Sequence, residues 1–207
     1  GFLLGLKKEK MASLWAWQYL HGMHSHQQAS QLRLISRMMT SRFNQEYVDV
    51  VLTSTEIMVC TYIGKLRNHI TSQHAQDRKQ DKSLDGVQIS INGVITEYAV
   101  AKFLKLPFDL NCDFRKFGAD LVTRKGKTID VKCTSKIGGN LNAVVWSNTK
   151  PVDVFVLTEI HNVCVRLVGW INSKDFLLEE NLFDVGNGEY YSVRQSELIP
   201  FEGNYHE

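Results

Sequence analysis

The stretch GADLVTRKGKTIDVKCTS, residues 118–135, has the pattern of a β-hairpin but carries charged side chains where apolar ones are usual. Strand residues alternate between the two faces of a sheet, so Asp130 and Lys132 project together. Ile129 and Val131 then face the other way. The second strand of the hairpin therefore presents an acid and a base side by side.

The length of the hairpin turn decides where the remaining acid, Asp120, is placed. With a two-residue turn at 125–126, Asp120 would oppose Val131, on the wrong face. A three-residue loop at 124–126 instead sets Asp120 opposite Asp130. Such loops typically end in a glycine with a left-handed backbone, and a glycine stands at that position. We therefore predict the three-residue loop and two carboxylates on one face.

Two neighbouring carboxylates repel each other unless a cation lies between them. Oxygen ligands favour a hard divalent ion, so the sequence predicts Mg²⁺, with Mn²⁺ as a substitute. Lys132 adds a cation beside such a site. Its role stays open among holding a nucleophilic water, helping to deprotonate that water and stabilising transition-state charge.

A further acid, Glu97, lies within a predicted helix that Asn92 caps and that Pro107 prevents from continuing. At helical spacing its neighbours are apolar, namely Val94, Val100, Ala101 and Leu104. Burying a carboxylate is costly unless a cation or hydrogen bonds compensate. Glu97 is therefore either a rim residue whose head reaches water or a functional acid.

Composition bounds the class of protein. The chain has 207 residues, 43% of them hydrophobic and 22% charged, as expected for one globular domain with appendages. We predict a single domain over 44–207, and over 1–43 a helical extension or a stretch foreign to the natural domain. The opening apolar run is shorter than the roughly 20 residues of a membrane span. We therefore expect no association with a membrane. Four cysteines without CxxC spacing favour a reducing, cytoplasmic setting.

The distribution of charge is more informative than the net charge of +2. Residues 102–136 contain nine Lys or Arg against four Asp, which suits a site that handles phosphate. A solvated face with one lysine-rich turn would give the same count. Val-rich runs predict strands at 118–123, 128–133, 141–146, 152–158 and 162–169.

The order Glu97 on a helix, Asp120 near one strand and Asp130-Val131-Lys132 on the next resembles the PD-(D/E)XK nuclease superfamily. The resemblance covers roughly residues 86–170 and is nearest to small members from phages and mobile elements. It implies an α/β fold with a mixed central sheet flanked by helices, a restriction-endonuclease-like core. That core runs helix, three-stranded meander, helix, strand.

The chain departs from the usual motif of this superfamily at two positions. Ala119 stands where the motif has proline, and Asp130 stands where glutamate is more common. The motif permits both.

By this resemblance the protein would be a Mg²⁺-dependent endonuclease that hydrolyses DNA phosphodiester bonds. Glu97, Asp120, Asp130 and the Val131 carbonyl would hold the metal, and Lys132 would serve the attacking water. One site cuts one strand, so a double-strand break would need a homodimer or two successive nicks. The residues expected to follow the phosphate backbone are Arg115, Lys116, Arg124, Lys125, Lys127, Thr134, Ser135 and Lys136.

Three other interpretations remain open. One is a catalytically inactive module of the same fold that binds nucleic acid or a protein partner. Another treats Asp130 and Lys132 as an exposed ion pair on a half-solvated sheet. The third is an enzyme that acts on RNA, since nothing in the sequence reads a 2′-hydroxyl.

Overall fold

The structure is a computed structural model that describes residues 47–74, 85–114, 118–149, 151–161, 163–184, 186 and 188–201. The prediction for residues 1–43 lies outside the described residues. So do the two predicted phosphate contacts Arg115 and Lys116.

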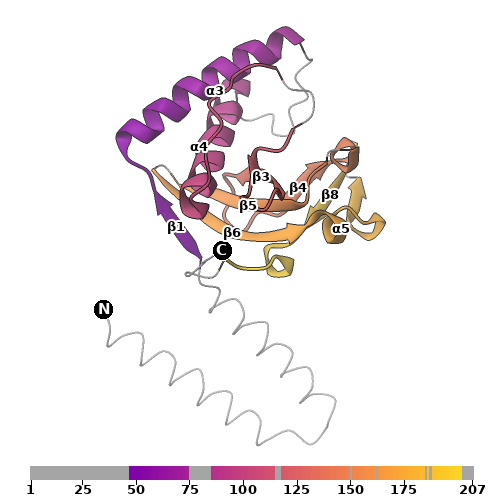
Figure 1. Ribbon diagram of the computed structural model, residues 1–207. Helices are drawn as coiled ribbons and strands as arrows, with labels where there is room; N and C mark the ends of the chain where they lie inside the picture. The colour runs from indigo at the N-terminus through magenta and orange to yellow at the C-terminus, as the bar shows by residue number, and fades with distance from the viewer. Residues whose placement is uncertain are drawn as a thin grey trace, which may run out of the picture. The chain divides into compact units, whose positions relative to one another are not determined.

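A five-stranded mixed sheet forms the centre of the domain (Figure 1), in the order β1-β6-β5-β3-β2. Strands β3 and β5 run parallel, and the other neighbouring pairs are antiparallel. The strands are β1 (Val48–Val51), β2 (Leu121–Val122), β3 (Thr128–Thr134), β5 (Val154–His161) and β6 (Cys164–Asn172). The mixed α/β class predicted from the sequence is thereby confirmed.

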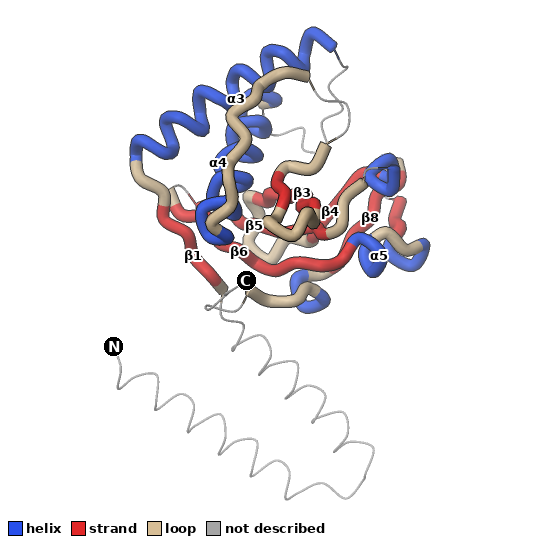
Figure 2. Tube along the Cα trace, viewed as in Figure 1, coloured by secondary structure: helices blue, strands red, loops and turns tan. Residues whose placement is uncertain are grey.

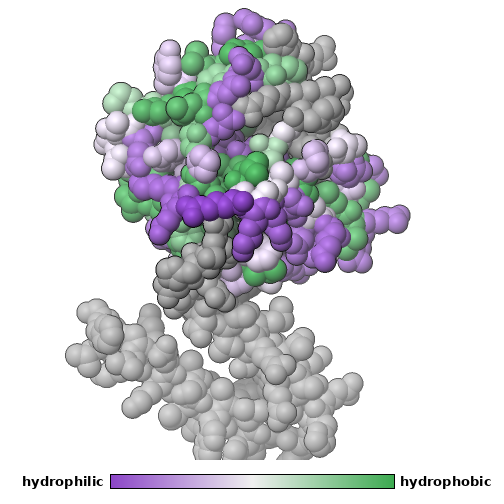
Figure 3. Space-filling view, in the orientation of Figure 1, coloured by the Kyte–Doolittle hydropathy of each residue, from purple (hydrophilic) through white to green (hydrophobic). Residues whose placement is uncertain are grey.

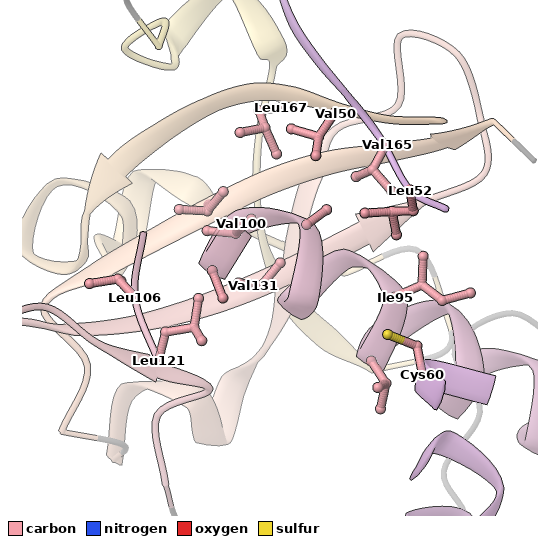
Figure 4. Close-up of a cluster of buried hydrophobic side chains, with 14 of the residues drawn as sticks. Val50, Leu52, Cys60, Ile95, Val100, Leu106, Leu121, Val131, Val165 and Leu167 are labelled. Atoms are coloured by element: carbon pink, nitrogen blue, oxygen red, sulfur yellow. The ribbon is translucent and has the colours of Figure 1, made fainter. Parts of the chain in front are cut away.

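Two helices, α3 (Ser54–His74) and α4 (Gly86–Leu104), cover one face of this sheet. The core between them and the sheet includes Val100 from α4 and Val131 from β3 (Figure 4). Helix α4 begins earlier than predicted, because Asp85 and not Asn92 occupies its N-cap position. The seven residues from Gly86 to Asn92 continue the helix and include the buried Ile91, so packing against α3 extends it.

The opposite face is covered by a second, three-stranded sheet with the order β4-β8-β7. Its strands are β4 (Leu141–Val144), β7 (Leu182–Asp184) and β8 (Glu189–Val193). A second core lies between the sheets and includes Phe155 and Phe176. Around it are α5 (Ser173–Phe176) and the 3-10 helices η1 (Val145–Thr149), η2 (Glu179–Asn181) and η3 (Gln195–Glu197).

The connection from β3 to β5 differs from the order that the resemblance implies. It carries the strand β4 and the 3-10 helix η1, not an α-helix (Figure 2). The predicted strand 141–146 accordingly ends at Val144. The polar residues that follow Trp146, including Ser147 and Asn148, suit a turn of 3-10 helix better than a strand.

The surface shows the usual mixture of polar and apolar residues. On the face seen in Figure 3, hydrophilic residues run across the middle and hydrophobic ones form smaller groups between them. No helix among the described residues is both long and apolar enough to cross a membrane.

Candidate active site

The hairpin of β2 and β3 has the register that the sequence predicts. Leu121 pairs with Ile129, and the N–H of Thr123 donates to the carbonyl of Lys127 over 2.8 Å. Residues 124–126 therefore form a three-residue loop. The glycine that closes it has a φ of 79°, in the left-handed region.

Replacing Gly126 by alanine is expected to lower the free energy of unfolding by about 1 kcal/mol. No heavy atom lies within 4 Å of a Cβ added there, so backbone strain is the whole cause. Urea unfolding measures the effect, and Gly126→Asn should lose less because asparagine tolerates this conformation. An alanine variant as stable as the native chain would contradict the strained loop.

Asp120 lies just outside β2, where regular pairing of the hairpin ends. Its N–H donates to the carbonyl of Ile129 over 2.9 Å. Its carboxylate Oδ2 accepts a hydrogen bond from the N–H of Val131 over 2.7 Å. Because β2 stops at the neighbouring residue, that N–H is available on the edge of β3, and the Asp120 side chain lies against it.

Asp130 and Lys132 lie on the face of β3 that points away from α4. Asp130 is 1% exposed, and its Oδ2 forms an ion pair with Lys132 Nζ. The Lys132 side chain is 28% exposed, and its Nζ lies 6.0 Å from the centroid of the Phe155 ring. Ile129 and Val131 point into the helix-side core, as the alternation predicts.

Glu97 extends from α4 and is paired with a residue that sequence reasoning missed. Its Oε2 lies 2.6 Å from Nη1 of Arg67, and its side chain is 14% exposed. Arg67 also donates to the carbonyls of Asp109 and Asn111, over 2.8 and 3.3 Å. One guanidinium thus ties together α3, α4 and the segment that leads toward Asp120.

A weak sequence signal could have drawn attention to Arg67. It continues the buried stripe of α3 after Cys60 and Ile63, at helical spacing, where a charged residue needs a partner. Nothing in the sequence says that the partner is Glu97, 30 residues away.

Replacing Arg67 by alanine is expected to cost about 2 kcal/mol of unfolding free energy, because Glu97 and two carbonyls lose their donor. Urea unfolding at neutral pH measures this cost. Lys102→Ala is the matched control, since Lys102 pairs with Glu56 over 2.8 Å but has a 38% exposed side chain. That control should cost less than about 1 kcal/mol. Equal losses in the two variants would show that the Arg67 pair has no special role.

The surroundings of Asp120 raise the pKa of its carboxyl group. Burial and the negative charges of Glu97 and Asp130 raise that pKa to about 8, against the opposing effects of Lys132 and the Val131 N–H. The side chain thus holds its proton at a pH where an exposed aspartate has lost it.

The other members of the cluster respond to the same charges. Burial raises the pKa of Glu97, and Asp130 adds to the rise while Arg67 opposes it. Burial alone would lower the pKa of Lys132, but Asp130 and Asp120 outweigh it and raise that pKa. The three acids therefore outnumber Lys132 and Arg67, the two cations that pair with them.

The donor set suits a hard divalent cation, because all three acids offer oxygen, and burial together with repulsion from Glu97 and Asp130 raises the pKa of Asp120. Protein cations already contact two of them, through the Asp130–Lys132 and Glu97–Arg67 pairs. Within the described ranges, no three His, Cys, Asp or Glu side chains are grouped closely enough to share one ion. Metal binding would therefore require these side chains to exchange partners. That the Val131 carbonyl serves as a metal ligand stays a prediction.

The predicted phosphate contacts that the structure describes lie at the two ends of β3. Arg124, Lys125 and Lys127 are exposed at the hairpin loop. Ser135 and Lys136 are exposed in the turn after β3, whereas the hydroxyl of Thr134 accepts a hydrogen bond from the Lys136 N–H over 3.1 Å. The basic residues thus flank the acidic cluster along the strand.

The fold and the cluster define a mixed α/β protein with one buried and two half-buried acids close to a lysine on a hairpin. Residues 47–164 match a protein family, and the chain belongs to it: the family of unknown function DUF5843. The matched range includes Glu97, Asp120, Asp130 and Lys132. Comparisons with curated proteins and with solved structures return no match.

Proposed function

We propose that this chain is a Mg²⁺-dependent DNA nuclease with a site of the PD-(D/E)XK type. The observation that carries the proposal is the cluster itself, in which Asp120, Asp130 and Lys132 from one hairpin interact electrostatically with Glu97 from α4. Placing one buried and two half-buried acids close to one lysine is costly for folding, and a catalytic role would account for it.

The residues of the cluster divide the work of phosphodiester hydrolysis. Asp120, Asp130 and Glu97 would hold Mg²⁺ or Mn²⁺, which when bound polarises phosphate oxygens and lowers the pKa of water. The ammonium of Lys132, with its pKa raised, stays charged near neutral pH. It would orient the attacking water or stabilise charge on the phosphate.

The exposed basic residues support a polyanionic substrate. Arg124, Lys125 and Lys127 at one end of β3 and Lys136 at the other would attract phosphates to both sides of the cluster. We propose DNA as that substrate, with a homodimer or successive nicks where both strands are cut. All four cysteines are free, which supports a reducing, cytoplasmic location.

A second candidate is a nucleic-acid-binding module that does not cut. It is favoured by the ion pairs of Asp130 with Lys132 and of Glu97 with Arg67, which provide cations for two of the acids without any metal. Such a module would bind DNA in the presence of EDTA, and mutating its acids would not change how it binds Mg²⁺.

The test incubates the protein with supercoiled plasmid, linear duplex, branched and single-stranded DNA, and RNA, with Mg²⁺, Mn²⁺ or EDTA. Calorimetry measures binding of the metal alone. Metal-dependent cleavage together with metal binding supports the nuclease. DNA binding without cleavage or metal binding supports the second candidate.

A further inference from the structure

Arg67 on α3 uses only one of its donor nitrogens to hold Glu97. Its Nη1 donates to Oε2 of Glu97, whereas Nη2 and Nε donate to the carbonyls of Asp109 and Asn111. The guanidinium carbon also lies 5.8 Å from the centroid of the Phe108 ring. These contacts outside the ion pair keep the guanidinium in place whether or not Glu97 is bound to it.

The Arg67–Glu97 pair lies where it can open. The side chain of Arg67 is 24% exposed, so water can accept the hydrogen bond that Nη1 gives to Glu97. The space beside Glu97 on α4 is also open. A Cβ built at Gly93, one turn earlier, would meet a single described atom within 4 Å beyond its chain neighbours and its own helix backbone, which is Oε1 of Glu97 at 3.9 Å. Glu97 therefore has room to turn on the helix.

The other acid that a protein cation contacts lacks this freedom. Asp130 is 1% exposed, has the shorter side chain, and pairs with Lys132 from the same strand in the middle of the domain. Of the two acids that already have a cation as partner, Glu97 is the one that can change its partner without disturbing the central sheet.

Glu97 lies close enough to the cluster to act on its other members. Burial contributes most to the raised pKa of Asp120, and among the charges around Asp120 the effect of Glu97 is the largest, ahead of that of Asp130. In the part of the chain that the structure describes, the acids are nevertheless not grouped closely enough to share one ion. Release from Arg67 is the change that would let the Glu97 carboxylate serve as the third ligand.

We propose that Arg67 competes with the divalent ion for Glu97, so that the Arg67–Glu97 pair is the metal-free state of the candidate site and opens when the ion binds. The inference rests on the proposed function, because it takes Glu97 as a metal ligand. In the exchange the Glu97 carboxylate gives up an N–H of Arg67 for the ion, both side chains keep their charges, and no proton moves. Arg67 weakens metal binding in two ways, because it occupies a ligand oxygen and its positive charge repels the ion.

The test measures the binding of Mg²⁺ alone by calorimetry, to the full native chain and to two variants. Arg67→Met removes the charge and keeps an unbranched stem, so it should bind Mg²⁺ about tenfold more tightly than the native chain. Arg67→Lys keeps a cation that can pair with Glu97, so its affinity should stay within about threefold of the native value. Circular dichroism and urea unfolding show that each variant is folded under the conditions used.

Two further variants assign the effect to the pair. Adding Glu97→Gln to Arg67→Met should remove most of the gain in affinity, because the contested carboxylate has lost its charge. Lys102→Met is the matched control, since Lys102 joins the same two helices through Glu56, outside the cluster. Its Mg²⁺ affinity should equal that of the native chain. An equal gain in Lys102→Met, or a gain that survives Glu97→Gln in full, would overturn the competition.

Cleavage of supercoiled plasmid by the same proteins is measured in parallel. Unchanged or weaker Mg²⁺ binding by Arg67→Met, in a chain that cuts DNA, rejects the competition and leaves the nuclease standing. Tighter binding that depends on Glu97, without cleavage by any of the proteins, upholds the competition and rejects the nuclease. Failure of every protein both to bind Mg²⁺ and to cut DNA rejects the two proposals together.

Discussion

Replacing Lys132 by methionine, or Asp120 by asparagine, is expected to reduce Mg²⁺-dependent cleavage of supercoiled plasmid on the order of 1,000-fold. Both substitutions preserve size, and each removes an ionisable group. Lys132→Met takes away the ammonium group that pairs with Asp130. Asp120→Asn keeps an oxygen that can accept the Val131 N–H but lowers the affinity of the site for a divalent ion. The measurement is the initial rate of plasmid nicking at one fixed metal concentration, chosen to saturate the native protein.

Two controls separate loss of chemistry from loss of fold. Lys132→Met leaves the buried Asp130 without its ammonium partner, so circular dichroism and the melting temperature must show that the variant is folded. Lys102→Met removes an ammonium group that pairs with Glu56, and it should cut at the native rate. Cleavage that survives in both site variants, or that needs no metal, would place the nuclease site elsewhere.

The second large effect concerns stability and pH. In EDTA, the free energy of unfolding of the native chain relative to Asp120→Asn is expected to fall by about 4 kcal/mol between pH 4 and pH 8. The pKa of Asp120 is about 8 in the fold, against 3.8 for the free side chain. A carboxyl whose pKa is raised on folding favours the folded state below the unfolded pKa. That contribution is lost as the pH rises toward the folded pKa.

Urea unfolding of both proteins at pH 4, 6 and 8 measures this difference. Asp120→Asn should be the more stable protein at pH 8, and the two should converge near pH 4. Groups whose pKa is lowered on folding, such as Glu56 at about 2, stabilise the fold less as the pH falls. Their contribution is the same in both proteins and cancels from the difference. A difference that does not change with pH would show that Asp120 ionises normally. Adding Mg²⁺ should raise the stability of the native chain most at pH 8, where a bound cation replaces the proton.

The experiments on stability and on cleavage examine one cluster through independent properties. The stability experiment depends on burial and on repulsion among the acids, whereas the cleavage experiment depends on hydrolysis of the phosphodiester bond. If the pH effect appears without cleavage, the acids are paired in the fold and the binding module becomes the better proposal. If the pH effect and metal-dependent cleavage both appear, the repulsion among the acids is the energetic cost of keeping a catalytic site in the fold.

Local patterns in the sequence determined the hairpin. Its register follows from side-chain alternation and from Gly126, whose left-handed φ of 79° closes the predicted loop. The strand positions also follow from patterns only a few residues long. These features depend on the backbone preferences of adjacent residues, so one sequence is enough to predict them.

The tertiary structure alone decided which distant residues meet. The pairing of Arg67 with Glu97 and the burial of Glu159 beneath the turn at Gly138 were not predicted. Strand β8 lies between β4 and β7 in a second sheet, and the predicted strand at 141–146 contributes β4 to that sheet and not to the central one. In each case the partner lies far along the chain. Its choice depends on how two hydrophobic cores fill the space on either side of one sheet, a property of the whole domain that no short window of sequence contains.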